Sequence, residues 1–112
     1  MDCIFCKIIK GEIPSTVVFE DEHVYAFRDI NPQMPTHIVV VPKNHFASCD
    51  EVTSENSVYI AKIFEAIPKI AKEEGLTCGY RVITNCGEHA CQSVKHIHFH
   101  ILGGGQMTDR MG

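Results

Sequence analysis

The sequence contains no tryptophan, and it lacks any apolar run long enough to span a membrane. A membrane-spanning helix needs about 18 to 20 mostly apolar residues, whereas the longest run, residues 38–41, has only the length of a strand. The chain also lacks an excess of positive charge, because its net charge is −4. Nucleic-acid binders need clustered lysine and arginine. We therefore predict neither a membrane protein nor a nucleic-acid partner.

The chain begins Met1-Asp2-Cys3 with no basic or apolar leader, so we expect no secretory signal. We therefore expect a cytoplasmic protein. In that compartment its 6 cysteines are expected to stay reduced or to bind metal rather than to form disulfides. A length of 112 residues with 45% hydrophobic residues suits one globular domain spanning residues 1–112.

The pattern of apolar residues predicts an α+β fold. β-branched and aromatic stretches predict five strands, at residues 16–20, 23–29, 36–41, 79–85 and 95–102. The unbroken apolar run in the third strand indicates burial on both faces. Short connections favour an antiparallel sheet, with a long helix on one face and a short N-terminal helix at residues 4–9. The tail, residues 103–112, has little to pack with, and we expect it to be flexible.

The long helix is expected over residues 53–74. Thr53 is a suitable cap at its start, and Gly75 is a suitable end. Pro68 lies inside and should kink the helix. Apolar residues at three- and four-residue spacing form a core-facing stripe, and they are Ile60, Ile63, Phe64, Ile67, Ile70 and Ala71.

Residues 96–102 carry the strongest functional signal, with the order His-Ile-His-Phe-His-Ile-Leu. In a strand this alternation places all three imidazoles on one face. An ordinary half-exposed strand would not require histidine at each outward position. A single metal bound by all three is disfavoured, because the Cα atoms of His96 and His100 would lie roughly 13 Å apart. The three histidines are therefore expected to divide the labour of a reaction.

Phosphoryl or nucleotidyl transfer suits such a row. Imidazole is largely neutral at pH 7, and one ring nitrogen can attack phosphorus while the other keeps its proton. A covalent intermediate divides a difficult displacement into two easier steps, and flanking imidazoles can donate to the phosphate oxygens. The central residue, His98, is the natural nucleophile because it has helpers on both sides.

A second signal is the Cys3-Ile4-Phe5-Cys6 segment, whose spacing suits two thiolates on one metal. A redox dithiol or chance spacing is the alternative reading. The default expectation for the other four cysteines is that they are small buried residues without comparable partners. These are Cys49, Cys78, Cys86 and Cys91.

The chain resembles the histidine triad (HIT) superfamily, whose signature is matched at every position of residues 96–102. The resemblance extends to Gly11-Glu12-Ile13-Pro14 and Pro42-Lys43-Asn44-His45. It is greatest to the histidine triad nucleotide-binding (Hint) branch, given residues 30–37 and the ending 102–107. The resemblance implies a purine nucleoside phosphoramidate or acyl-nucleotidyl hydrolase, with a nucleotidyl-histidine formed at the α-phosphate. A diadenosine-polyphosphate hydrolase, a Zn²⁺-dependent hydrolase and a non-catalytic nucleotide-binding module remain as alternatives.

The resemblance also implies roles for individual residues. The catalytic set would be His98, supported by His37, His96 and His100, with Ser93 assisting the leaving amine. The nucleotide site would contain Phe5, Phe27, Asp29, Ile30, Asn85, Cys91, Gln92, Ser93, His98 and His100. Within it, Asn85 and the amides of Gln92 and Ser93 would hold phosphate, Asp29 would receive the ribose hydroxyls, and Phe5, Phe27 and Ile30 would line the base pocket.

Structural alternatives remain open for several of these residues when each is taken alone. Asp29 can be a turn former, and His37 can be a buried residue bonded to a carbonyl. Asn85 can be an ordinary loop residue, and Ser93 can cap a turn. The aromatic rings of Phe5 and Phe27 suit a core in either case.

Bacterial members of this type imply a structural Zn²⁺ held by Cys3, Cys6, His45 and His96, and no organic cofactor. The family also implies a homodimer. Two features depart from the family pattern. Cys91 stands in the phosphate loop where glycine is usual, and the C-terminal tryptophan of many relatives is absent.

Overall fold

The computed structural model describes residues 3–112, so Met1 and Asp2, on which the expectation about the leader rests, lie outside the described residues. The elements follow the predicted order. The helices are α1 (Ile4–Ile9) and α2 (Ser57–Glu73), and two short 3₁₀ turns are η1 (Cys49–Glu51) and η2 (Glu88–Ala90). The strands are β1 (Val17–Glu20), β2 (Val24–Arg28), β3 (Thr36–Pro42), β4 (Tyr80–Ile83) and β5 (Phe99–Gly103). Within the described residues, no helix is long and apolar enough to cross a bilayer.

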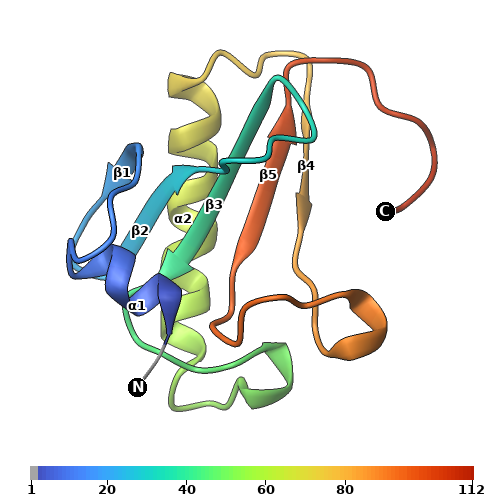
Figure 1. Ribbon diagram of the computed structural model, residues 1–112. Coiled ribbons are helices and arrows are strands. Elements are labelled where there is room, and N and C mark those ends of the chain that lie inside the picture. Colours follow the sequence, from blue (N-terminus) through green and yellow to red (C-terminus); the bar gives the residue numbers. More distant parts are fainter. Residues whose placement is uncertain (1–2) are drawn as a thin grey trace.

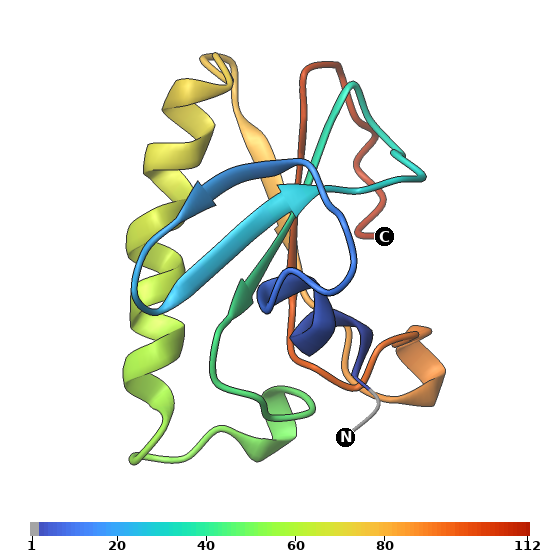
Figure 2. The same ribbon diagram turned by 60° about the vertical axis from the view of Figure 1, so that its left-hand side comes forward.

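The five strands form one antiparallel sheet in the order β1-β2-β3-β5-β4, which confirms the predicted α+β class. Helix α2 covers one face of this sheet, and α1 lies on the opposite side (Figures 1 and 2). Strand β3 is buried along residues 38–42 because it has a packed layer on each side. The burial predicted for its apolar run is therefore confirmed.

Helix α2 begins later than predicted. Thr53 is not its cap, because its hydroxyl accepts from the Glu55 amide, and its own amide donates to the Asn56 side chain in a preceding turn. The helix continues through Pro68 to Glu73 and ends before Gly75, which has a φ of +72°. Most of the predicted stripe packs against the sheet, but Phe64 is 51% exposed, with its ring edge against Phe99 at a centroid distance of 5.5 Å.

The last strand is shorter than predicted, because pairing with β3 and β4 begins only near Phe99. Before it, the Ile97 amide donates to the Phe46 carbonyl at 2.8 Å instead of to a neighbouring strand. Ile97, Phe99 and Ile101 nevertheless face the α2 side of the sheet. The predicted alternation of faces is therefore correct, although His96 and His98 lie outside the strand.

The C-terminal segment has more contacts than we expected. The Arg81 guanidinium on β4 donates to the carbonyl oxygens of Thr108 at 2.8 Å and Arg110 at 2.9 Å. Gly104 lies near Pro35, which immediately precedes β3. The bonds from Arg81 attach the tail to β4, although most residues from 104 to 112 are exposed, and its flexibility stays a prediction.

Candidate functional site

Two groups of side chains gather on the sheet face opposite α2. The first, the histidine cluster, consists of His37, His98 and His100. The second, the thiol–imidazole cluster, consists of Cys3, Cys6, His45 and His96. His100 points to this face because it pairs in register with Val39, whose side chain packs with the α1 side of the sheet. The segment 96–100 thus contributes to both groups.

The backbone sets the protonation of His98. Its Nδ1 lies 2.8 Å from the carbonyl oxygen of His96. A carbonyl oxygen only accepts, so Nδ1 carries the proton, and Nε2 keeps a lone pair. The His98 ring is buried, with the edge of the Phe5 ring at a centroid distance of 5.0 Å. This burial lowers the pKa of His98, and the imidazole is therefore a neutral nucleophile at pH 7.

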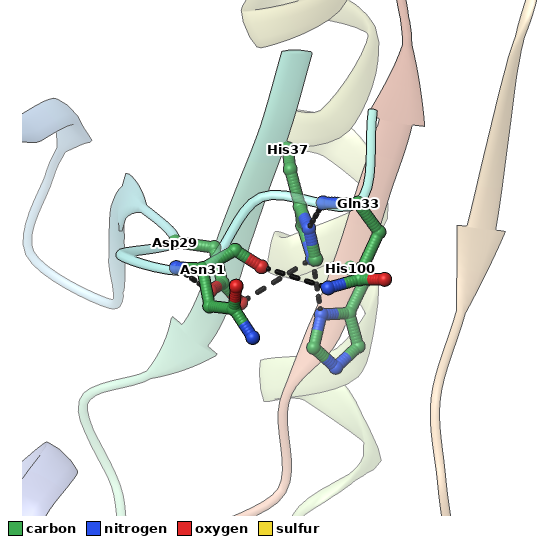
Figure 3. Close-up of polar contacts among 5 residues, drawn as sticks. All are labelled: Asp29, Asn31, Gln33, His37 and His100. Atoms are coloured by element: carbon green, nitrogen blue, oxygen red, sulfur yellow. Dashed lines mark hydrogen bonds and ion pairs between the residues drawn. The ribbon is translucent and has the colours of Figure 1, made fainter. Parts of the chain in front are cut away.

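A directed chain of hydrogen bonds orients the next imidazole (Figure 3). The Gln33 amide donates to Nδ1 of His37 at 3.0 Å, so the proton of a neutral His37 must be on Nε2. That Nε2 lies 2.9 Å from Nδ1 of His100 and 3.4 Å from a carboxylate oxygen of Asp29. Nδ1 of His100 therefore accepts, and its Nε2 carries the hydrogen that is available to a ligand.

The loop between β2 and β3 positions the Gln33 amide, the first donor in this chain of hydrogen bonds. The Asn31 amide donates to Oδ1 of Asp29 at 2.8 Å, and the Gln33 side chain donates to the Asn31 carbonyl at 3.0 Å. Figure 3 shows these contacts closing the loop beside His37. The Gln33 amide is thereby directed at His37, which is buried at 6% exposure.

His100 is a neutral donor near pH 7. Burial, together with the neighbouring His98 and His37, lowers the pKa of His100 from 6.5 to about 4, although Asp29 acts in the opposite direction. Within the histidine cluster, His98 therefore offers a lone pair and His100 offers an N–H, two complementary functions for attack on a phosphate ester.

The thiol–imidazole cluster has the dimensions of a tetrahedral metal site. Its four ligand atoms lie within 4.8 Å of one another. The sulfur of Cys6 is 3.4 Å from Nδ1 of His45 and 3.6 Å from Nδ1 of His96, and Cys3 is 3.5 Å from the latter. Zinc bond lengths in a tetrahedron predict an S···N separation of about 3.5 Å. These four residues can hold a metal ion.

A backbone carbonyl also orients His96 for this cluster. Its Nε2 lies 2.8 Å from the Pro42 carbonyl oxygen, so the proton is on Nε2, and Nδ1 is free to bind metal. His96 is completely buried, whereas His45 is exposed. Such an outer hydrogen bond is typical of histidine ligands in metal sites.

The loop 86–93 contains an unusual backbone position. Cys91 has a φ of +59° and a ψ of +38°, and it is the one non-glycine residue with positive φ in the described part of the chain. The left-handed conformation normally favours glycine. The structure thus shows that cysteine accommodates a left-handed backbone conformation at this position.

The Gln92 amide has a partner within the loop. It donates to the Gly87 carbonyl at 3.1 Å, and its expected contact with phosphate stays a prediction. The buried side chain of Gln92 accepts from the Gly87 amide and donates to the carbonyls of Ala47 at 2.6 Å and Val94 at 2.9 Å. Gln92 therefore braces the loop internally.

Among the other predicted nucleotide-site residues, Phe5 lies against His98 and Asp29 lies near His37. Phe5 and Phe27 meet edge to face with centroids 5.5 Å apart. Ile30 is completely exposed and therefore lines no enclosed pocket in the chain alone. Asn85 is half-buried and Ser93 is exposed, on either side of η2.

Sequence reasoning missed several orienting groups, two of which are backbone atoms. The Gln33 amide and the Pro42 carbonyl have no recognisable sequence pattern. The Thr84 hydroxyl, which donates to the His98 carbonyl at 2.7 Å, was equally unmarked. The remaining cysteines were also misjudged, since Cys49, Cys78 and Cys91 are exposed and Cys86 is half-buried.

Comparison with known proteins gives consistent matches over nearly the whole chain. The family model described as "Scavenger mRNA decapping enzyme C-term binding" matches residues 2–112. A 14 kDa zinc-binding protein from Zea mays is 54% identical over 113 residues, which cover 94% of this chain and 84% of the relative.

Two further matches bear on activity. A purine nucleoside phosphoramidase from Escherichia coli (strain K12) is 44% identical, covering 92% of this chain and 87% of the enzyme. The structure of a HIT family hydrolase from Clostridium thermocellum superposes with a TM-score of 0.96 at 46% identity, covering 98% of this chain and 96% of that one.

Proposed function

This chain belongs to the histidine triad (HIT) superfamily as a nucleotide hydrolase, and we propose that it cleaves purine nucleoside phosphoramidates and acyl nucleotides through a nucleotidyl-histidine on His98. The single observation that carries this proposal is the bond from Nδ1 of His98 to the His96 carbonyl. That bond leaves Nε2 of a buried, neutral imidazole as the nucleophile.

The first step forms one bond and breaks another. The Nε2 lone pair of His98 attacks the α-phosphorus, and the P–N bond to the leaving amine breaks with its electron pair remaining on nitrogen. The amine takes up a proton, and the exposed Ser93 hydroxyl is the group we assign to assist this transfer. In the second step water attacks phosphorus, the bond to His98 breaks, and the nucleoside monophosphate is released.

His100 stabilises the charge on the phosphate oxygens. Its Nε2–H is available because Nδ1 accepts from His37, and its pKa of about 4 keeps it neutral. A fixed donor aimed at developing negative charge lowers the barrier without reorganisation. His37 acts through His100 and is a positioning residue.

The nucleoside would lie beside the first turn of α1 and the end of β2. We assign the base to the side of the Phe5–Phe27 pair, with Ile30 covering it from the solvent side, and the ribose hydroxyls to Asp29. Asn85, Ser93 and the loop around Cys91 would hold the phosphate. The Gln92 side chain holds this loop in place.

We assign a structural zinc ion to Cys3, Cys6, His45 and His96. The donor set and its S···N distances of 3.4 to 3.6 Å fit tetrahedral zinc. When bound, the ion supplies a cross-link between α1, the segment after β3 and the approach to β5. His96 then orients His98 through its carbonyl, so the metal site braces the nucleophile without taking part in the reaction.

The decisive experiment is mass spectrometry of the protein mixed with adenosine 5′-phosphoramidate and quenched in denaturant. The wild type is expected to gain one adenylyl group during turnover, and His98→Ala is expected to gain none and to lose at least about 1,000-fold in kcat/KM. His89→Ala is the matched control, because His89 is an exposed histidine on η2.

An adenylyl adduct that persists in His98→Ala would overturn the assignment of the nucleophile. A wild type that binds the compound without turnover would instead support a non-catalytic binding module. Faster cleavage of diadenosine polyphosphate than of the phosphoramidate would move the substrate class to the dinucleotides.

A further inference from the structure

Cys49 and Cys86 lie together, although they are far apart in the sequence. Cys49 begins η1, and Cys86 follows β4 on the way to η2. Their sulfur atoms and a carboxylate oxygen of Asp50 lie within 4.8 Å of one another. Cys49 is exposed and Cys86 is half-buried, so a small reagent can reach the pair.

The two cysteines flank the connection between two loops. Gln92 donates to the Ala47 carbonyl at 2.6 Å and accepts from the Gly87 amide at 3.0 Å. Cys49 lies two residues after Ala47, and Cys86 immediately precedes Gly87. The thiols therefore lie at an existing contact between the segment 46–51 and the loop 86–93, where little movement is needed to bring them closer.

The surroundings suit a resting dithiol. The adjacent Cys86 thiol and burial raise the pKa of Cys49, and Asp50 acts in the same direction. Cys49 therefore rests as a thiol at neutral pH, and only its small thiolate fraction can attack an oxidant. A protein disulfide requires sulfur atoms about 2.05 Å apart, so the two sulfurs must move closer before the bond can form.

We propose that Cys49 and Cys86 form a redox-active pair that a low-molecular-weight disulfide, RSSR, oxidises to an intramolecular disulfide. One cysteine, as its thiolate, attacks a sulfur of RSSR, so one S–S bond breaks and one RSH leaves. The second cysteine then attacks the mixed disulfide, losing its proton and releasing a second RSH. The two protein thiols are oxidised, and the two sulfurs of the reagent are reduced.

This bond would fasten η1 to the start of the loop that carries Gln92 and Ser93. The pairing depends on the proximity of two thiols and not on the proposed hydrolase activity. The disulfide proposal is tested by thiol chemistry, and the hydrolase proposal is tested by the adenylyl adduct. Failure of either proposal therefore does not affect the other.

The test uses the folded, zinc-supplemented full chain, treated with oxidised glutathione, alkylated with iodoacetamide and mapped by peptide mass spectrometry. The expected product is a Cys49–Cys86 cross-link that dithiothreitol reverses. It should exceed the glutathione adduct at Cys86 by at least about tenfold, because the second thiol acts at high effective concentration. In Cys49→Ser, glutathione should instead accumulate on Cys86.

The matched control is Cys78→Ser, which removes another exposed thiol and should leave the cross-link unchanged. The proposal would be overturned if Cys49 and Cys86 of the wild type each carried a separate glutathione and formed no cross-link. A second metal equivalent that is lost in Cys49→Ser and protects both thiols would also overturn it, because the group with Asp50 would then be a metal site.

Discussion

Neighbouring histidines of one short segment acquire three functions because each has a different hydrogen-bond partner. His96 donates through Nε2 to the Pro42 carbonyl, which leaves Nδ1 facing the thiols of the thiol–imidazole cluster. His98 donates through Nδ1 to a carbonyl and leaves Nε2 free. His100 accepts through Nδ1 and therefore donates through Nε2. The tautomer of each ring, and not its residue type, decides what it can do.

His100 should make the stability of the protein depend on pH. Its pKa lies at about 4 in the folded chain and at the ordinary histidine value of 6.5 in the unfolded chain, so between these values the unfolded chain binds a proton that the folded chain does not. The free energy of unfolding should therefore be highest above pH 6.5 and should fall as the pH is lowered from 6.5 to about 4. The total loss should be on the order of 3 kcal/mol. His100→Gln should flatten this slope in urea titrations at pH 7, 6 and 5.

The exposed histidine of η2 provides the control, since His89→Gln should retain the wild-type dependence. Both variants and the wild type are compared with saturating zinc, so that loss of metal in acid does not enter the difference. An identical slope in His100→Gln and the wild type would show that His100 is not kept neutral by its surroundings.

At the scale of elements, the thiol–imidazole cluster brings together parts of the chain that are far apart in the sequence. Cys3 and Cys6 belong to α1 and its cap, His45 follows β3, and His96 precedes β5. The α1 helix has only 6 residues, which is too short to be stable alone. Bound metal should therefore stabilise α1 and the approach to β5 together.

Cys6→Ser should consequently abolish metal binding and lower the Tm by about 10 °C or more. Plasma emission spectrometry should find one zinc per wild-type chain and none in the variant, while differential scanning calorimetry gives the Tm. Cys78→Ser, which changes an exposed thiol outside the cluster, should match the wild type in both measurements. Turnover of Cys6→Ser is measured at a temperature at which the variant is folded. Turnover that survives supports a structural ion. Complete loss of turnover would favour a zinc-dependent hydrolase.

Sequence periodicity predicted the elements and most of their ends to within two residues, but it placed the starts of α2 and β5 four residues too early. Alternation correctly placed Ile97, Phe99 and Ile101 on the α2 side, because side-chain direction follows local backbone geometry. The start of β5 depended instead on the Phe46 carbonyl, which captures the Ile97 amide. The start of α2 likewise depended on a turn in which Asn56 binds the Thr53 amide. Such choices between competing partners depend on tertiary position and leave no periodic signal.

The candidate site shows the same division. The residue types at 96, 98 and 100 predicted phosphate chemistry, and the cysteine spacing suggested a metal. The Gln33 amide that orients His37, and the occupied Gln92 amide, could not be predicted because every residue other than proline has an amide. The proximity of Cys49 and Cys86 also arises only when the chain folds.

At the scale of the whole molecule, the β4 edge of the sheet is suited to pairing with a second copy of the chain. Strand β4 is an edge strand, and edge strands present unpaired backbone groups that natural proteins cover or protect. Tyr80 on β4 is 39% exposed, and Phe64, which packs against Phe99 of the adjoining β5, is 51% exposed. We propose that this edge forms the homodimer interface, with two sheets joined through β4.

Light scattering after size-exclusion chromatography should then give twice the 12.5 kDa mass of the chain. Tyr80→Glu should shift the protein towards the monomer, because a carboxylate buried in an interface without a partner costs several kcal/mol. Val17→Glu is the matched control, since Val17 is 46% exposed on β1 at the opposite edge, and it should leave the dimer intact. If Val17→Glu dissociates the dimer and Tyr80→Glu does not, the sheets join through β1. A wild type that elutes as a monomer at all concentrations would exclude the dimer. The β4 edge would then have to be protected within one chain, where Arg81 on β4 already binds the carbonyls of Thr108 and Arg110.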